Sequence, residues 1–306
     1  MPSTTGRLAL KARWVFPVVQ RPLADGLLTM EGPRIVAVGA NSSGAPARDL
    51  GDVALLPGFV NPHTHLEFSE LRRPLGEPGI TFPDWIAQVV AWRRGAAPTT
   101  DPREPQAAAV AAGLRESLAC GVTTLGDIAT ADAAAATTRE HRIAIVSFRE
   151  LMGLSAGRIA RQVEIARGHL NCLRGDGRRR GGLGPHAPYT THPEVVARAC
   201  RLSRQSGVPV AMHLAESEEE MELLATGGGP LRELLSQLGS WVPTAVRAGT
   251  SSGDYLELLG TGHRSLVVHG NYLGPGDWEF LASRAATMAV VYCPRTHAYF
   301  RHARYP

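Results

Sequence analysis

The sequence has few cysteines, no long apolar run and little net charge, and each scarcity excludes a class of protein. Its four cysteines (Cys120, Cys172, Cys200 and Cys293) lie too far apart for a CxxC site and are too few for a disulfide scaffold in 306 residues. The chain has no run of about 18 apolar residues and does not open with a basic and apolar leader. We therefore expect a protein of a reducing compartment, cytoplasmic and without a membrane partner.

The charge balance argues against a nucleic-acid partner. The chain carries 32 basic and 28 acidic residues, for a formal net charge of +4. Its arginines are scattered except for Arg178-Arg179-Arg180, and glycines flank that run on both sides, which favours a solvated loop over a nucleic-acid patch. A small-molecule partner is expected, and self-association into a homo-oligomer is left open.

The pattern of apolar residues changes near residue 55. Before it the chain reads as short strands and turns, with Glu31-Gly32-Pro33 as a hairpin signal between two of them. After it, strands alternate with helical stretches, which is typical of parallel βα units. We predict a partial β-sandwich over residues 1–55 and a catalytic barrel over residues 56–306. The strands expected in the barrel are 56–63, 122–127, 143–148, 182–186, 208–213, 265–269 and 288–292, and the clearest helices are 104–119, 157–170, 193–206 and 276–285.

Seven such strands predict an α/β fold, a (β/α)8 barrel that lacks its eighth strand. In a parallel barrel the functional side chains gather at the carboxyl ends of the strands. His63 and His65 stand at the end of the first strand, and alternate side chains of an extended segment point the same way, as two imidazole ligands of one metal ion must. Three later strands also end in histidine: His186, His213 and His269.

These histidines stand in motifs that resemble the amidohydrolase superfamily. The motifs are His63-Thr64-His65 after Leu-Leu-Pro-Gly-Phe-Val-Asn-Pro, Gly184-Pro185-His186, His213-Leu214-Ala215-Glu216 and Val268-His269-Gly270. The nearest resemblance is to its chlorohydrolases and aromatic or nucleobase-type deaminases with a single divalent metal.

The resemblance implies a role for each of these residues. His63, His65 and His213 would bind one ion, Zn²⁺ in the first place and Fe²⁺ as the alternative. Glu216 would move a proton from water to a departing amine, His269 would orient the water, and His186 would contact substrate.

Two further residues are expected at the substrate pocket. Trp85 belongs to an apolar stripe with helical spacing (Phe82, Trp85, Ile86 and Val89), which either packs in the core or covers the pocket after the first strand. His297 follows the seventh strand, where the resemblance implies a substrate contact.

The resemblance also implies an eighth strand with an aspartate ligand, and the sequence given ends at Pro306 before any such strand. Two hypotheses follow for this chain. The first is a metal-dependent hydrolase of carbon–nitrogen bonds that deaminates an amino-substituted heterocycle. The second is a truncated homologue that is catalytically impaired or inactive.

Overall fold

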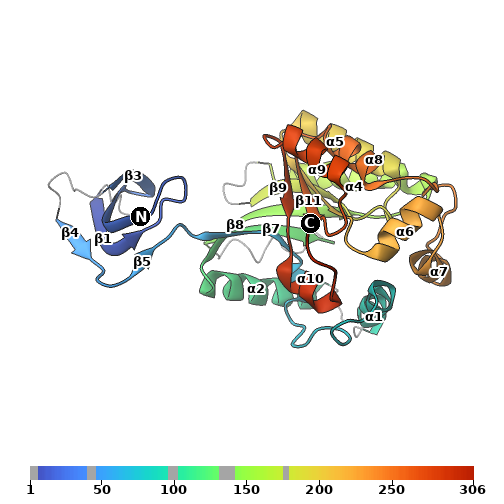
Figure 1. The fold of residues 1–306 in the computed structure, drawn as a ribbon, viewed down its shortest axis with the longest axis horizontal. Helices are drawn as coiled ribbons and strands as arrows, with labels where there is room; N and C mark the ends of the chain where they lie inside the picture. Colours follow the sequence, from blue (N-terminus) through green and yellow to red (C-terminus); the bar gives the residue numbers. More distant parts are fainter. Residues whose placement is uncertain (1–5, 40–45, 96–102, 131–141, 175–178) are drawn as a thin grey trace. The chain divides into compact units, whose positions relative to one another are not determined.

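The computed structural model describes residues 6–39, 46–95, 103–130, 142–174 and 179–306. The chain divides into two compact units, Met1–Phe59 and Val60–Pro306. None of the helices in these described ranges has both the length and the apolar character needed to cross a bilayer. The ribbon in Figure 1 follows the chain through both units.

The N-terminal unit is a single five-stranded sheet. Its strands are β1 (Arg7–Val15), β2 (Leu23–Glu31), β3 (Arg34–Gly39), β4 (Ala47–Asp49) and β5 (Ala54–Leu55). The first three pair antiparallel, and the two short strands pair with β1 in parallel. Gly32 turns the chain between β2 and β3 with a φ of 56°, a left-handed conformation that glycine adopts without steric cost, so the predicted hairpin is confirmed. The assignment of residues 1–55 to a partial β-sandwich stays a prediction.

The second unit is organised around a seven-stranded sheet whose strands lie in chain order. They are β6 (Phe59–Thr64), β7 (Val122–Ala129), β8 (Ala144–Leu151), β9 (Arg179–Pro185), β10 (Pro209–Leu214), β11 (Arg264–His269) and β12 (Met288–Val291). Neighbours from β7 to β12 pair in parallel. The predicted barrel-type α/β fold with seven strands is confirmed.

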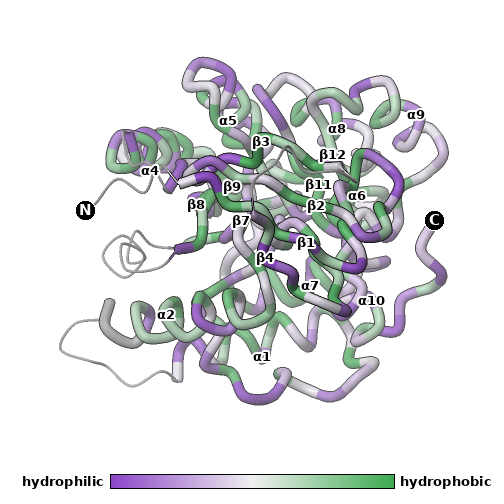
Figure 2. Tube along the Cα trace, turned by 90° about the vertical axis from the view of Figure 1, so that its left-hand side faces the viewer, coloured by the Kyte–Doolittle hydropathy of each residue, from purple (hydrophilic) through white to green (hydrophobic). Residues whose placement is uncertain are grey.

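Helices alternate with these strands, as the sequence pattern predicts. They are α1 (Phe82–Gly95), α2 (Arg103–Ala119), α4 (Ile159–Cys172), α5 (Pro193–Ser206), α6 (Glu218–Thr226), α7 (Pro230–Gln237), α8 (Ser252–Leu259), α9 (Pro275–Ser283) and α10 (Pro294–Phe300), with short 3-10 turns at Leu66–Phe68 and Ala156–Arg158. Local chemistry sets their bounds. In α5, Pro193 occupies the first turn, where its missing N–H costs nothing, and Gly207 ends the helix with a φ of 65°. Around the sheet, helices such as α5 alternate hydrophilic and hydrophobic segments (Figure 2).

One apolar cluster joins the inner residues of five strands. It consists of Ile128, Phe148, Ala211, Val268 and Val291, from β7, β8, β10, β11 and β12, and all are buried. Gly182 of β9 makes room for this cluster, because a β-carbon there would come within 2.6 Å of the Phe148 ring. This packed interior holds the strands in place. The polar residues at the carboxyl ends of the strands are therefore held at defined positions.

The arginine run departs from the expected solvated loop. Arg178 lies outside the described residues, but Arg179 and Arg180 already belong to β9, and Arg179 is only 6% exposed. The strand therefore begins three residues earlier than predicted, because the pairing of β9 with β8 extends back to Arg179 opposite Ile145.

Candidate functional site

Three histidines from two strand ends meet at one point of the barrel. His63 lies in β6, His65 directly follows it, and His213 lies near the end of β10. One ring nitrogen from each lies within 4.8 Å of the others, and the Nε2 atoms of His65 and His213 are 3.2 Å apart. The structure thus brings together the three residues that the sequence predicts as metal ligands.

The protonation of these rings fits a metal ion. His213 Nδ1 lies 2.9 Å from the carbonyl oxygen of His186, which can only accept, so Nδ1 carries the proton and Nε2 keeps its lone pair. Two nitrogens at about 2.0–2.1 Å from a tetrahedral ion would be separated by about 3.3 Å. Burial is the main cause that lowers the pKa of His63, His65 and His213, the last to about 4, so all three imidazoles are neutral at pH 7 and could act as ligands.

Two nitrogens of the group also lack partners. The Nδ1 atoms of His63 and His65 are buried and make no hydrogen bond with any described residue. A buried polar atom without a partner is costly. A bound ion would accept a lone pair from one ring nitrogen of each of the three histidines. The residues present therefore fit a divalent metal.

Glu216 and His269 form a second pair beside the histidines. Oε1 of Glu216 lies 3.1 Å from Nε2 of His269, and both residues are buried. Burial, followed by the charge of Glu220, raises the pKa of Glu216 well above its usual value, while burial lowers the pKa of His269. Burial therefore opposes a full charge on either group, and the two atoms lie close enough to share a proton.

Backbone contacts hold Glu216 in place. The carboxylate of Glu220 accepts hydrogen bonds from the backbone N–H groups of Ala215 and Glu216, at 3.0 and 2.9 Å. The Asn271 side chain donates to the Glu216 carbonyl oxygen at 2.8 Å. Glu220 and Asn271 are positioning residues that sequence reasoning missed. The acidic run 218–220 gave no reason to single out its third member, which is completely buried in the fold.

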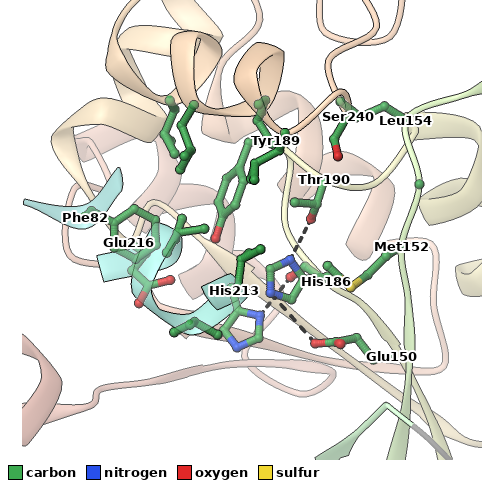
Figure 3. A pocket seen from close by; sticks show the side chains of 18 of the residues that line it. Phe82, Glu150, Met152, Leu154, His186, Tyr189, Thr190, His213, Glu216 and Ser240 are labelled. Carbon is green, nitrogen blue, oxygen red and sulfur yellow. Dashed lines mark hydrogen bonds and ion pairs between the residues drawn. The ribbon is translucent and has the colours of Figure 1, made fainter. Parts of the chain in front are cut away.

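His186 is fixed by a short chain of hydrogen bonds, of which Figure 3 shows the link to Thr190. Its Nδ1 lies 2.6 Å from the Thr190 hydroxyl, and that hydroxyl donates to the Ala187 carbonyl. The hydroxyl proton is thus used, so His186 Nδ1 donates and Nε2 is left as an acceptor. Glu150, at the end of β8, places Oε1 3.8 Å from that Nε2, and its side chain is 3% exposed. Burial raises the pKa of Glu150 and lowers that of His186 to about 3.

These groups line one cavity of about 670 Å³. Its polar part, here called the histidine floor, is made by residues at strand ends: His63, His65, Glu150, His186, His213, Glu216 and His269. Its apolar part, here called the apolar wall, is made by residues of α1 and α7: Phe82, Trp85, Ile86, Val89, Val90, Leu231, Leu234 and Leu235. Phe82 and Trp85 stack with ring centroids 6.1 Å apart, and Phe300 meets the edge of Trp85 at 5.6 Å.

The structure brings Trp85 to the cavity and does not bring His297 there. His297 is absent from the described lining, and its Nε2 hydrogen-bonds the Ala303 carbonyl oxygen at 2.8 Å. Its neighbour Thr296 lines the cavity instead. The helix α10 begins at Pro294, and it directs successive side chains about 100° apart around its axis. Position in the sequence alone could not select between the two.

Asp127 connects the second strand to the histidine pair. Its Oδ1 accepts a hydrogen bond from the backbone N–H of Leu66, the residue after His65, at 3.0 Å. The carboxyl is 2% exposed, and burial raises its pKa to about 7. Asp127 is not within the cavity lining, so its place in the structure is that of a clamp on the chain that carries His65.

The chain matches known proteins over most of its length. Residues 54–306 match the model of the amidohydrolase family. An aminodeoxyfutalosine deaminase from a Nitratiruptor species is 27% identical over 246 residues, covering 78% of this chain and 56% of that protein. A 5-methylthioadenosine/S-adenosylhomocysteine deaminase of Pelotomaculum thermopropionicum is 25% identical over 285 residues, covering 89% and 59%. The chain therefore spans somewhat over half the length of these curated relatives.

A solved structure shares the fold. The aminofutalosine deaminase of Helicobacter pylori, in complex with methylthio-coformycin, aligns with a TM-score of 0.82 at 20% identity. The alignment covers 97% of this chain and 72% of that one. At this level of identity the likeness is one of fold alone.

Proposed function

Because the chain belongs to the amidohydrolase family, we propose that it hydrolyses the carbon–nitrogen bond of an amino-substituted heterocycle and releases ammonia. The observation that carries this proposal is the meeting of three neutral histidines with the Glu216–His269 pair in one cavity. The deaminase names of its relatives support deamination over dechlorination. Those relatives are named for adenosine-like compounds, which favours a purine substrate with an amino group.

The metal site proposed here consists of His63, His65 and His213, with Zn²⁺ as the ion that best fits an all-imidazole set and Fe²⁺ as the alternative. When bound, such an ion lowers the pKa of water toward neutrality and so supplies a nucleophile. All three rings are ready to ligate without losing a proton, since burial already keeps them neutral.

The chain's own residues handle the proton. Water adds its oxygen to the ring carbon that bears the amino group, and one of its protons passes to Glu216. Glu216 then delivers that proton to the departing nitrogen and the carbon–nitrogen bond breaks. The second proton of the water moves from the oxygen to the adjacent ring nitrogen, so the products are a ring carbonyl beside a ring N–H group, and ammonia. His269, 3.1 Å from Glu216, holds the carboxyl in position during both transfers.

The cavity orients the heterocycle between its two sides. Trp85 and its neighbours in the apolar wall offer a surface on which a flat ring can lie. On the floor, His186 presents an acceptor nitrogen held by Thr190. This combination of a stacking surface and a few placed polar groups is typical of small-molecule sites.

One observation favours the second hypothesis, an impaired homologue. Within the described part of the chain, the group of His63, His65 and His213 includes no carboxylate ligand. Three histidines hold the catalytic zinc ion in carbonic anhydrase, so the group still fits an ion. The two hypotheses differ in whether such a centre turns over substrate.

Ammonia release decides between them. The protein is loaded with one equivalent of Zn²⁺ and offered a panel of aminated purines, pterins, pyrimidines and triazines, with Glu216→Gln as the matched inactive control. We expect release from at least one aminated purine by the wild-type protein and none above background by the variant. A fully zinc-loaded, folded protein that releases no ammonia from any of these compounds would count against deamination of this substrate class and favour the impaired homologue.

A further inference from the structure

Cys293 has its sulfur beside the histidine cluster, and no step of the proposed reaction uses it. It follows β12 and immediately precedes α10, and it packs against the inner apolar cluster of the barrel that contains Val268 and Val291. Its side chain is half-buried, and its thiol makes a weak hydrogen bond of 3.7 Å to the carbonyl oxygen of Val291. The sulfur therefore lies at the carboxyl end of the strands, where the functional groups gather.

The sulfur has two imidazoles within reach. The Sγ of Cys293 and one ring nitrogen each of His63 and His269 all lie within 4.8 Å of one another. The Nδ1 atoms of both histidines are buried and have no hydrogen-bond partner among the described residues. His269 is 4% exposed, and its other nitrogen is already paired with Glu216. The unpaired nitrogen is thus available to an ion without breaking the Glu216 contact.

We propose that His63, His269 and Cys293 form a second metal position, which shares His63 with the first and takes a thiophilic divalent ion such as Zn²⁺, Co²⁺ or Cd²⁺. Two imidazoles and one thiolate make a donor set suited to these ions and poorly suited to Mg²⁺ or Ca²⁺, which prefer oxygen. Burial raises the pKa of Cys293 to about 11, so the thiol holds its proton until an ion arrives. Binding forms a metal–sulfur bond and releases that proton to solvent.

Sharing His63 couples the two positions. An ion held by Cys293 and His269 draws on a residue that the set of His63, His65 and His213 also needs. It also engages the imidazole that holds Glu216. Occupation of the second position is therefore expected to reduce turnover at the first, so that excess thiophilic metal inhibits.

Cobalt absorption tests the position without any assay of turnover. Protein stripped by a chelator is titrated with Co²⁺, and near-ultraviolet thiolate-to-cobalt charge-transfer absorption is recorded. The background carries Cys120→Ser and Cys172→Ser, because those two cysteines are exposed and could bind cobalt on their own. We expect the band in this background and its loss in Cys293→Ser. No band, or a band that survives Cys293→Ser, would overturn the proposal.

Two histidine variants separate the two positions. In His65→Ala the set of His63, His65 and His213 loses a ligand, while the set of His63, His269 and Cys293 is intact. The charge-transfer band should therefore persist, and it should appear at a lower cobalt concentration than in the parent protein. In His269→Ala the intensity of the charge-transfer band should fall at least tenfold. A band of full intensity in this variant would overturn the assignment of His63, His269 and Cys293 as one ligand set. His213→Ala repeats the first test if His65→Ala does not fold, as judged by circular dichroism. All readouts are spectroscopic, so failure of the deaminase proposal would leave them unaffected.

Discussion

The histidine floor and the apolar wall of the cavity are held in place by different means. Floor residues stand at strand ends above a packed apolar interior, and backbone groups fix them, as the His186 carbonyl fixes His213. Wall residues lie on α1 and α7, two helices that pack against each other and belong to the segments between strands. The floor is thus built into the barrel, whereas the wall can vary with the loops. Chemistry should depend on the floor and substrate choice on the wall.

Removal of a floor ligand should have the largest effect. His63 belongs to both ligand sets, so His63→Ala is expected to reduce bound zinc from about one equivalent to near none and activity to background. Metal analysis after gel filtration measures this directly. His297→Ala is the matched control, because His297 lies outside the described cavity lining and should keep its zinc. Equal zinc content in both variants would contradict the ligand assignment.

Loss of the proton carrier should come next. Glu216→Gln keeps the size of the side chain but cannot move a proton, so kcat is expected to fall roughly 10²–10⁴-fold, the usual contribution of general acid–base catalysis. Zinc content and melting temperature should stay within error of the wild type. A loss of less than tenfold with normal zinc would remove Glu216 from the reaction.

A change in the wall should act on binding more than on chemistry. Trp85→Ala removes a stacking surface, and losing ~60 Å² of apolar contact costs ~1.5 kcal/mol, so KM is expected to rise about tenfold with little change in kcat. Since Trp85 also contacts Phe82 and Phe300, Trp85→Phe serves as the conservative variant that should restore most of the binding. If kcat falls as much as for Glu216→Gln, the division between floor and wall is wrong.

The smallest effect on turnover is expected at Asp127, whose carboxyl accepts a hydrogen bond from the backbone N–H of Leu66, the residue after His65. Burial raises its pKa from 3.8 to about 7, so its contribution to stability is fully present below pH 3.8 and is lost as pH rises through 7. At ~1.4 kcal/mol for each pKa unit, the loss is on the order of 4 kcal/mol at most. Asp127→Asn keeps an acceptor for the Leu66 N–H and carries no charge.

Melting curves of the metal-free proteins between pH 4 and 8 test this. The wild type should lose stability relative to Asp127→Asn as pH rises, while the histidines contribute equally to both. A constant difference in melting temperature across that range would contradict a raised pKa. A variant less stable than the wild type at every pH would show that the carboxylate itself is required.

Much of this arrangement could be predicted from the sequence because strand periodicity is a local signal. All seven barrel strands and the four clearest helices lie within a few residues of their predicted bounds. His63, His65, His213, Glu216 and His269 meet because parallel strands align their carboxyl ends, which is a property of the fold class.

What could not be predicted depends on packing between elements. Glu150 was missed because β8 was expected to end at residue 148, whereas the strand runs on to Leu151 and puts Glu150 at the cavity. The rule that selected the histidines, an ionisable residue at a strand end, would have selected Glu150 too. Helix α7 was not predicted to line the pocket, because it reaches the cavity only by packing on α1. The direction of His297 depends on how α10 is rotated.

The carbonyl oxygen of His186 has a consequence for how such a site can evolve. It accepts from both the backbone N–H and the ring Nδ1 of His213, each at 2.9 Å, while the His186 side chain faces the cavity. Residue 186 therefore performs two separable tasks, one with its main chain and one with its ring. A side-chain substitution that leaves the backbone in place would still supply the carbonyl, so it is expected to change the proposed substrate contact without changing the tautomer of His213. The ring of His186 can therefore change while the carbonyl that orients the proposed ligand His213 is kept.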